Sequence, residues 1–137
     1  MTTSQIRMAA TLTLEGARRL AAAGEAEAMQ RGWAVAIAVV DPAGGLILFH
    51  CLDLAQPASQ EVAIAKARTA ARFKRPTKAM EDGVAGGRMG LLSLSGALLL
   101  EGGVPVLRDG VIVGAVGVSG MTSAEDGIIA AAAVAGG

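Results

Sequence analysis

The sequence predicts an α+β fold, in which one antiparallel sheet of about five strands is covered by helices. Three observations predict it. The patterns follow the order helix, two strands, helix, three strands, helix; short hairpin turns join the strands; and 137 residues suffice to bury the core of one domain. No internal repeat divides the chain, so we expect residues 1–137 to form a single domain.

The N-terminal third of the chain predicts a helix and two strands. Small apolar residues recur at helical spacing over 12–31, and Gly32 predicts the end of that helix. The nearly continuous apolar run 33–40 is typical of a central strand that is buried on both faces. The small residues at 43–45 predict a turn, so the strand expected over 46–52 returns antiparallel to the first.

The middle of the chain predicts two helices and a further strand. A helix is expected over 59–73, because one face is apolar at helical spacing and Pro76 follows its end. A short helical piece over 77–82 and a loose glycine-rich segment over 83–90 come next. Small and then apolar residues over 93–100 predict a third strand.

The C-terminal third predicts a β-hairpin followed by a helix. Asp109 and Gly110 form a two-residue turn of the type I′ kind between two valine-rich runs. Ser123 and Asp126 resemble a capping box, which predicts a last helix over 128–134. Glycines in strands mark places where a ligand or another backbone comes close, and they stand at both ends of the hairpin: Gly102, Gly103, Gly114, Gly117 and Gly120.

Composition argues against several classes of function. The 12 basic and 12 acidic residues cancel, so neither nucleic acid nor an anionic membrane surface is an expected partner. The first residues hold no apolar core of signal-peptide length, and no apolar run in the chain reaches the ~18 residues of a membrane span. Hydrophobic residues make up 53% of the chain, which predicts self-association. Cys51 is the only cysteine, so we expect no internal disulfide, a reducing compartment and a cytoplasmic location.

Three motifs, taken together and in this order, resemble one family. They are AVAIAVVDPAGGLILF at 34–49, AIAKARTAARFKRPT at 63–77 and GGVPVLRDGVIVGAVGVSG at 102–120. The chain resembles the GlcG/HbpS-like family, which is also found as the C-terminal domain of PduO proteins. The resemblance implies a profilin-like sheet with helices packed on both faces, a small-ligand pocket, and assembly into a dimer or a higher oligomer such as an octamer.

Members of this family have been associated with several activities. Some members have been associated with haem, some with corrinoid-related metabolism or glycolate-utilisation gene clusters, and a few with the turnover of ring-cleavage products. The resemblance therefore implies a ligand pocket without fixing one ligand.

Five residues are candidates for a small-ligand site. Lys66 lies on an apolar helix face and Arg75 lies in the second motif, so either cation could hold a carboxylate, and Lys66 could instead be a catalytic base with a depressed pKa. Glu101 is the candidate general acid or base, and the backbone N–H groups of Gly102 and Gly103 could bind an anion. The alternative for Lys66 is that it lies at a helix edge with its ammonium group in water. The alternative for Glu101 is that it is a solvated glutamate at the end of a strand.

Two more arginines follow Lys66 on the expected helix. Arg68 and Arg72 lie on its charged side, and we expect them to be solvated and paired with Glu61 and Glu81, with ligand contact as the alternative.

His50 and Cys51 are further candidates for ligand contact. His50 could bind haem iron or act as an acid or base, and Cys51 could be a soft ligand or a nucleophile. The alternative for His50 is an ordinary residue at the edge of the sheet, and the alternative for Cys51 is a small, buried hydrophobic residue. Adjacent strand residues point to opposite faces, so the two should not meet at one atom, and we expect no metal site.

Two classes of function follow. The first is a protein that binds or acts on a small carboxylate, a hydroxy acid or an unsaturated ring-cleavage-type acid, through cofactor-free isomerase, lyase, deaminase or hydrolase chemistry in catabolism. The alternative is a non-catalytic haem- or corrinoid-binding module. Only Trp33, Phe49 and Phe73 could stack on a macrocycle, and there is no histidine pair, so we expect no cofactor.

Overall fold

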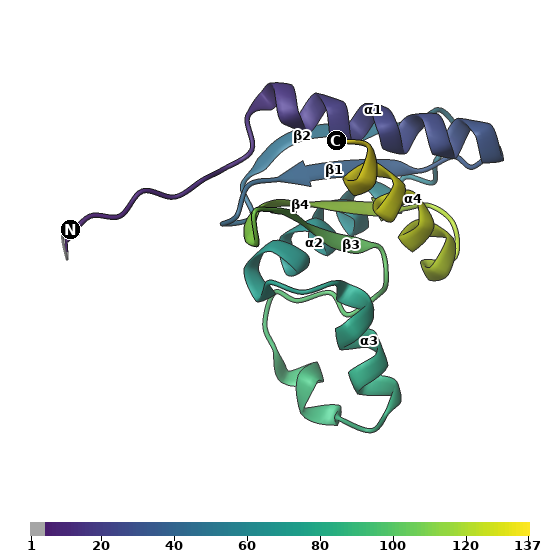
Figure 1. Ribbon diagram of the computed structural model, residues 1–137. Helices are drawn as coiled ribbons and strands as arrows, with labels where there is room; N and C mark the ends of the chain where they lie inside the picture. The colour runs from purple at the N-terminus through teal and green to yellow at the C-terminus, as the bar shows by residue number, and fades with distance from the viewer. Residues whose placement is uncertain (1–4) are drawn as a thin grey trace.

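A four-stranded antiparallel sheet with the order β2-β1-β4-β3 forms the centre of the fold (Figure 1). The structure is a computed structural model and describes residues 5–137. The strands are β1 (Ala36–Val40), β2 (Leu46–Cys51), β3 (Gly103–Arg108) and β4 (Val111–Ser119). The helices are α1 (Leu14–Arg31), α2 (Ala58–Phe73), α3 (Thr77–Ala85), the 3-10 helix η1 (Met89–Ser93) and α4 (Ser123–Gly136).

Helices pack on both faces of this sheet, which confirms the predicted fold class. Every residue of β1 is buried, as its continuous apolar run predicts. Ile37 and Val39 face the core cluster that includes residues of α1 and α4, whereas Ala36 and Ala38 face the alanines of α2. The alternation of side chains along β1 therefore divides the core into two layers.

The C-terminal helix begins five residues earlier than predicted. Thr122, and not Ser123, is its N-cap, and the Thr122 hydroxyl accepts a hydrogen bond from the Glu125 backbone N–H at 3.2 Å. The Glu125 carboxylate in turn accepts from the Thr122 backbone N–H at 3.2 Å. The capping box is thus real but starts one residue upstream, which leaves Asp126 free for another role.

The strand predicted over 93–100 is wrong, so the sheet has four strands and not five. Its first residue ends η1, and Gly96 adopts a φ of 71°, which lies outside the extended region. The Leu98 backbone N–H donates to the Thr69 hydroxyl at 2.9 Å. This segment is therefore held by the side chain of a helix and lies along α2, although its composition is apolar.

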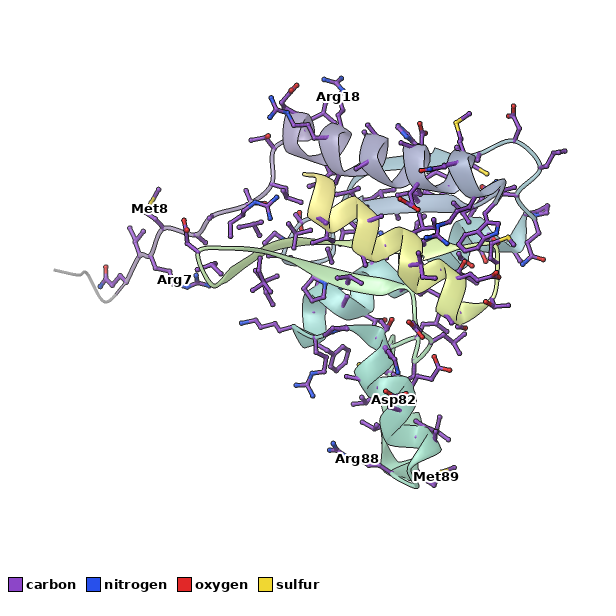
Figure 2. The ribbon with its side chains drawn as sticks, turned by 45° about the vertical axis from the view of Figure 1, so that its right-hand side comes forward. Arg7, Met8, Arg18, Asp82, Arg88 and Met89 are labelled. Carbon is purple, nitrogen blue, oxygen red and sulfur yellow. The ribbon has the colours of Figure 1, made fainter. Side chains whose placement is uncertain are left out.

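Two segments extend away from the layered body. Figure 2 shows Arg7 and Met8 on the extended N-terminal segment, and Arg88 and Met89 at the tip of the arm formed by α3 and η1. The N-terminal segment joins the body where the Leu12 backbone N–H donates to the Val113 carbonyl at 2.9 Å. Within residues 5–137, no helix has the length and apolarity needed to cross a membrane.

Glycines in the hairpin let α2 pack directly on the sheet. A Cβ atom at Gly117 would overlap the Ala63 carbonyl oxygen and the Ala67 nitrogen, and one at Gly103 would overlap the Lys66 carbonyl oxygen. At Gly103 and Gly117, the close approach predicted for the strand glycines is therefore an approach of helix backbone.

We expect Gly117→Ala to destabilise the protein by about 3 kcal/mol or more, because the added methyl group meets helix backbone that cannot move aside. Chemical denaturation measures the change in the free energy of unfolding. Gly90→Ala is the matched control, since a Cβ atom there has no neighbour within 4 Å. Equal stability of the two variants would contradict this account of the packing.

Candidate functional site

Lys66 is buried and has an internal partner. Its Nζ atom donates to Asp126 Oδ2 and to the Val118 carbonyl, each at 3.0 Å. The side chains of Lys66 and Asp126 are both 2% exposed. The alternative of a lysine at a helix edge is therefore wrong. A ligand carboxylate would have to compete with the Asp126 carboxylate for the Lys66 ammonium group.

Asp126 completes a small network at the end of the sheet. Its Oδ1 atom accepts from the Met121 backbone N–H at 2.9 Å. Burial raises the pKa of the Asp126 carboxyl above its ordinary value of 3.8, while the Met121 N–H and the Lys66 ammonium oppose that rise. The sequence did not single out this partner, because Asp126 fitted the capping-box pattern; a lysine on an apolar helix face was the signal that a carboxylate was needed.

Gly102 and Gly103, at the start of β3, lie against this network. Gly102 has a φ of 132°, and a Cβ atom there would lie 2.8 Å from Lys66 Nζ. The Gly103 backbone N–H donates to the Thr77 hydroxyl at 2.9 Å, and the Gly102 carbonyl accepts from the Val118 N–H at 2.9 Å. The Gly103 donor predicted for an anion is therefore already used by Thr77.

The structure brings Glu101 to the same corner, whereas in residues 5–137 Arg75 forms no side-chain hydrogen bond or ion pair with the groups there. Glu101 is half-buried, and its carboxyl group lies against Gly127, the residue after Asp126. Its backbone N–H donates to Glu81 Oε1 at 2.7 Å. Arg75 is exposed, and its Nε atom donates to the Phe73 carbonyl at 2.9 Å.

His50 and Cys51 lie on opposite faces of the edge strand β2, as strand alternation predicts. His50 Nδ1 is 2.7 Å from Glu25 Oε1 of α1. Cys51 Sγ is 3.8 Å from Gln60 Nε2 of α2, and the cysteine is exposed rather than a buried hydrophobe. Among residues 5–137, no group of three or more His, Cys, Asp or Glu side chains could hold a metal ion.

Cys51 borders a mainly apolar hollow of about 440 Å³ between the end of α1 and the segment after β2. The Arg31 guanidinium lies over the Trp33 ring, 5.0 Å from its centroid, so one face of the indole is covered. The residues that line this mainly apolar hollow are Met29, Gly32, Trp33, Ala34, Cys51, Leu52, Asp53 and Leu54.

A second hollow, of about 520 Å³, contains two arginines and is called the arginine hollow below. It lies between the outer side of α2 and the segment 96–98, which the Leu98–Thr69 hydrogen bond holds beside the helix. Its lining residues are Glu61, Ile64, Ala65, Arg68, Arg72, Gly96, Ala97 and Leu98.

The turn between β1 and β2 fixes both arginines. Arg68 Nε donates to the Gly44 carbonyl at 3.0 Å, and Arg72 Nε donates to the Ala43 carbonyl at 2.9 Å. In the described part of the chain, neither arginine forms an ion pair, so the predicted pairing with Glu61 and Glu81 is wrong. Both guanidinium groups therefore have terminal N–H groups without a carboxylate partner.

We expect Lys66→Met to cost about 3–5 kcal/mol of stability at neutral pH, because it leaves the Asp126 carboxylate buried and unpaired. The raised pKa of Asp126 gives the sign of the pH dependence: its protonated form favours the native state, and this contribution is lost as pH rises above 3.8 through the folded-state pKa. The cost of Lys66→Met should therefore shrink as pH falls.

Urea denaturation of Lys66→Met and of the double variant Lys66→Met/Asp126→Asn over a pH series measures both effects. The double variant should regain much of the lost stability, since the buried charge is gone. A single variant as stable as the wild type at neutral pH would show that the pair contributes nothing.

Comparison with known proteins agrees with this fold. Residues 12–135 match the family described as haem degrading protein HbpS-like. Protein GlcG of Escherichia coli (strain K12) is 44% identical over 108 residues, which cover 79% of this chain and 81% of GlcG. The crystal structure of the Klebsiella pneumoniae protein ORFY is similar with a TM-score of 0.90 and 30% identity, and the match covers 98% of this chain and 96% of ORFY.

The crystal structure of a PduOC complex with haem is also similar, with a TM-score of 0.82 and 29% identity over 92% of this chain and 94% of PduOC. The sequence match extends from the residues just before α1 nearly to the end of α4, and the structural matches include the whole sheet. The chain therefore belongs to the HbpS-like family.

Proposed function

We propose that this protein binds a small carboxylate-bearing ligand in the arginine hollow. The observation that carries the proposal is the pair of arginines, Arg68 and Arg72, whose Nε atoms are held by turn carbonyls while no acidic side chain in residues 5–137 pairs with them.

The chemistry of the two guanidinium groups fits this ligand. Residues four apart on a helix are neighbours on its surface, so Arg68 and Arg72 present their charges to one region. Each guanidinium uses one donor on the turn and keeps terminal N–H groups in the fork geometry that matches a carboxylate. Anchoring also reduces the side-chain freedom that a ligand would otherwise have to remove.

Turnover is a separate part of the proposal and would take place beside Glu101, which is not among the residues that line the arginine hollow. Glu101 is half-buried beside the network of Lys66 and Asp126, which is the setting of a general acid or base in cofactor-free isomerase, lyase, deaminase or hydrolase chemistry. Lys66 or Arg75 would then hold the acid at this corner. Lys66 is already paired with the Asp126 carboxylate, and Arg75 lines neither of the two hollows described above, so the arginine hollow is favoured for binding.

We expect Arg68→Gln and Arg72→Gln each to weaken the binding of small acids by about tenfold, because each removes a charge-assisted contact worth about 1.5 kcal/mol. Calorimetric titration with cis,cis-muconate and with 6-hydroxyhexanoate measures the change. Arg75→Gln is the matched control and should bind as the wild type does.

The opposite pattern of binding among these variants would place the acid outside the arginine hollow. If Arg75→Gln and Glu101→Gln abolish binding while Arg68→Gln and Arg72→Gln keep it, the acid lies beside Glu101, Gly102 and Gly103. If Glu101→Gln spares binding and lowers turnover about a hundredfold, Glu101 is the general acid or base.

Haem binding is a second candidate, and the names of the relatives favour it: the matching family is described as haem degrading, and PduOC was crystallised with haem. The mainly apolar hollow beside Cys51 could contact a macrocycle. His50 and Cys51 fit poorly as a pair of iron ligands within one chain, because they lie on opposite faces of β2 and His50 is next to Glu25. No step of the proposed chemistry therefore uses haem.

We expect added haemin to bind weakly, with a Soret band that His50→Ala leaves unchanged, since His50 contacts Glu25 and not the apolar hollow. Absorption titration of the wild type, His50→Ala and Cys51→Ser measures this. A tight complex abolished by His50→Ala would show that haem is the ligand and that His50 binds its iron.

We also infer self-association into a dimer or a larger assembly in a reducing, cytoplasmic setting. Exposed apolar side chains on the projecting segments support it: Met8, Met89 and Leu92 are 94%, 59% and 60% exposed. Sedimentation of the purified chain tests the assembly, and a monomer of 13.6 kDa would exclude it.

A further inference from the structure

The arginine hollow carries opposite charges at its two ends. Glu61 lies in the first turn of α2, whereas Arg72 lies in the last turn. Both line the same hollow, together with Arg68. α2 is one continuous helix, partly covered by β3 and β4 in the view of Figure 1, so Glu61, Arg68 and Arg72 follow its axis in order.

The stretch between the charges is apolar. Ile64 and Ala65 line the hollow between Glu61 and Arg68, and Leu98 lines it from the neighbouring segment. A helix rises about 1.5 Å per residue, so Glu61 and Arg68 are separated by about 10 Å along the axis. With a side chain reaching in from each end, the space between them suits an extended chain of about six carbon atoms, which is roughly 6 Å long.

Glu61 requires a different ligand group from the one that the arginines require. An ionised glutamate only accepts hydrogen bonds, and in residues 5–137 Glu61 forms no ion pair or hydrogen bond with a side chain. A hydroxyl or ammonium group would satisfy it. A second carboxylate at that end would face a like charge and would be disfavoured.

We propose that the arginine hollow selects acids with one carboxylate and a hydrogen-bond donor at the far end, in preference to dicarboxylates. The carboxylate lies at Arg68 and Arg72, the carbon chain lies over Ile64 and Ala65, and the hydroxyl or ammonium group donates to Glu61. This inference rests on the proposed function, since it assumes that an acid binds at the two arginines. Of the candidate ligand classes, it favours hydroxy acids and amino acids over unsaturated diacids.

Four acids of equal chain length test this polarity. Hexanoate, 6-hydroxyhexanoate, 6-aminohexanoate and adipate share the carboxylate that meets the arginines and differ only at the far end. In calorimetric titrations of the full chain at neutral pH, we expect 6-aminohexanoate and 6-hydroxyhexanoate to bind about fivefold more tightly than adipate. The difference is modest because Glu61 is exposed and solvent screens its charge.

Charge changes at one position then isolate the role of Glu61. Glu61→Gln should bring adipate and 6-aminohexanoate to nearly equal affinity, and Glu61→Lys should make adipate the tightest of the four. Glu15→Gln is the matched control, because it removes the same charge from an exposed residue of α1 on the other side of the sheet. It should leave the order of the four acids unchanged.

The outcomes distinguish the inference from the proposed function. If adipate binds the wild type as tightly as 6-aminohexanoate and Glu61→Gln changes nothing, the polarity is overturned while acid binding at the arginines stands. If none of the four acids binds the wild type, the proposed function fails and the polarity falls with it. An affinity order that inverts in Glu61→Lys but not in Glu15→Gln supports the inference.

Discussion

The buried ion pair of Lys66 and Asp126 joins the two helical layers of this protein. Lys66 belongs to α2 on one face of the sheet, and Asp126 belongs to α4 on the other. The contact passes beside the Val118 carbonyl at the end of β4, where Gly102 leaves room for the ammonium group. Because a single unpaired charge at this depth would be costly, both layers must keep their positions relative to the sheet for either partner to remain satisfied.

This constraint determines which side of α2 is available for chemistry. The inward side of the helix is set by Lys66 and by alanines that pack on glycines of the hairpin, so the rotation of the helix about its axis is fixed. The opposite side then necessarily presents Glu61, Arg68 and Arg72 outward, and the carbonyls of the β1–β2 turn are close enough to hold both guanidinium groups. The arginine hollow is thus a consequence of core packing on the other side of the same helix.

The sequence predicted what depends on local pattern and missed what depends on tertiary partners. The apolar run of β1, the Asp109–Gly110 hairpin and the cap at Gly32 are local signals, and each appears in the structure. The segment 93–100 has strand-like composition, but its backbone is held by the Thr69 hydroxyl, a contact that no periodicity reveals. The pairing of Lys66 with Asp126, 60 residues apart, and the anchoring of Arg68 on Gly44 were missed for the same reason.

The charged side chains of the candidate site lie outside both core clusters. Glu61, Arg68 and Arg72 belong to neither core cluster, so we expect substitutions of these three residues to have small effects on stability, whereas Ile64 of the same hollow packs against the alanine cluster. Relatives that share the sheet and the inward alanines of α2 can therefore differ in the charges that they present on this side. The fold fixes the position of the helix, whereas the ligand proposed for the arginine hollow depends on the charges that this chain places at Glu61, Arg68 and Arg72.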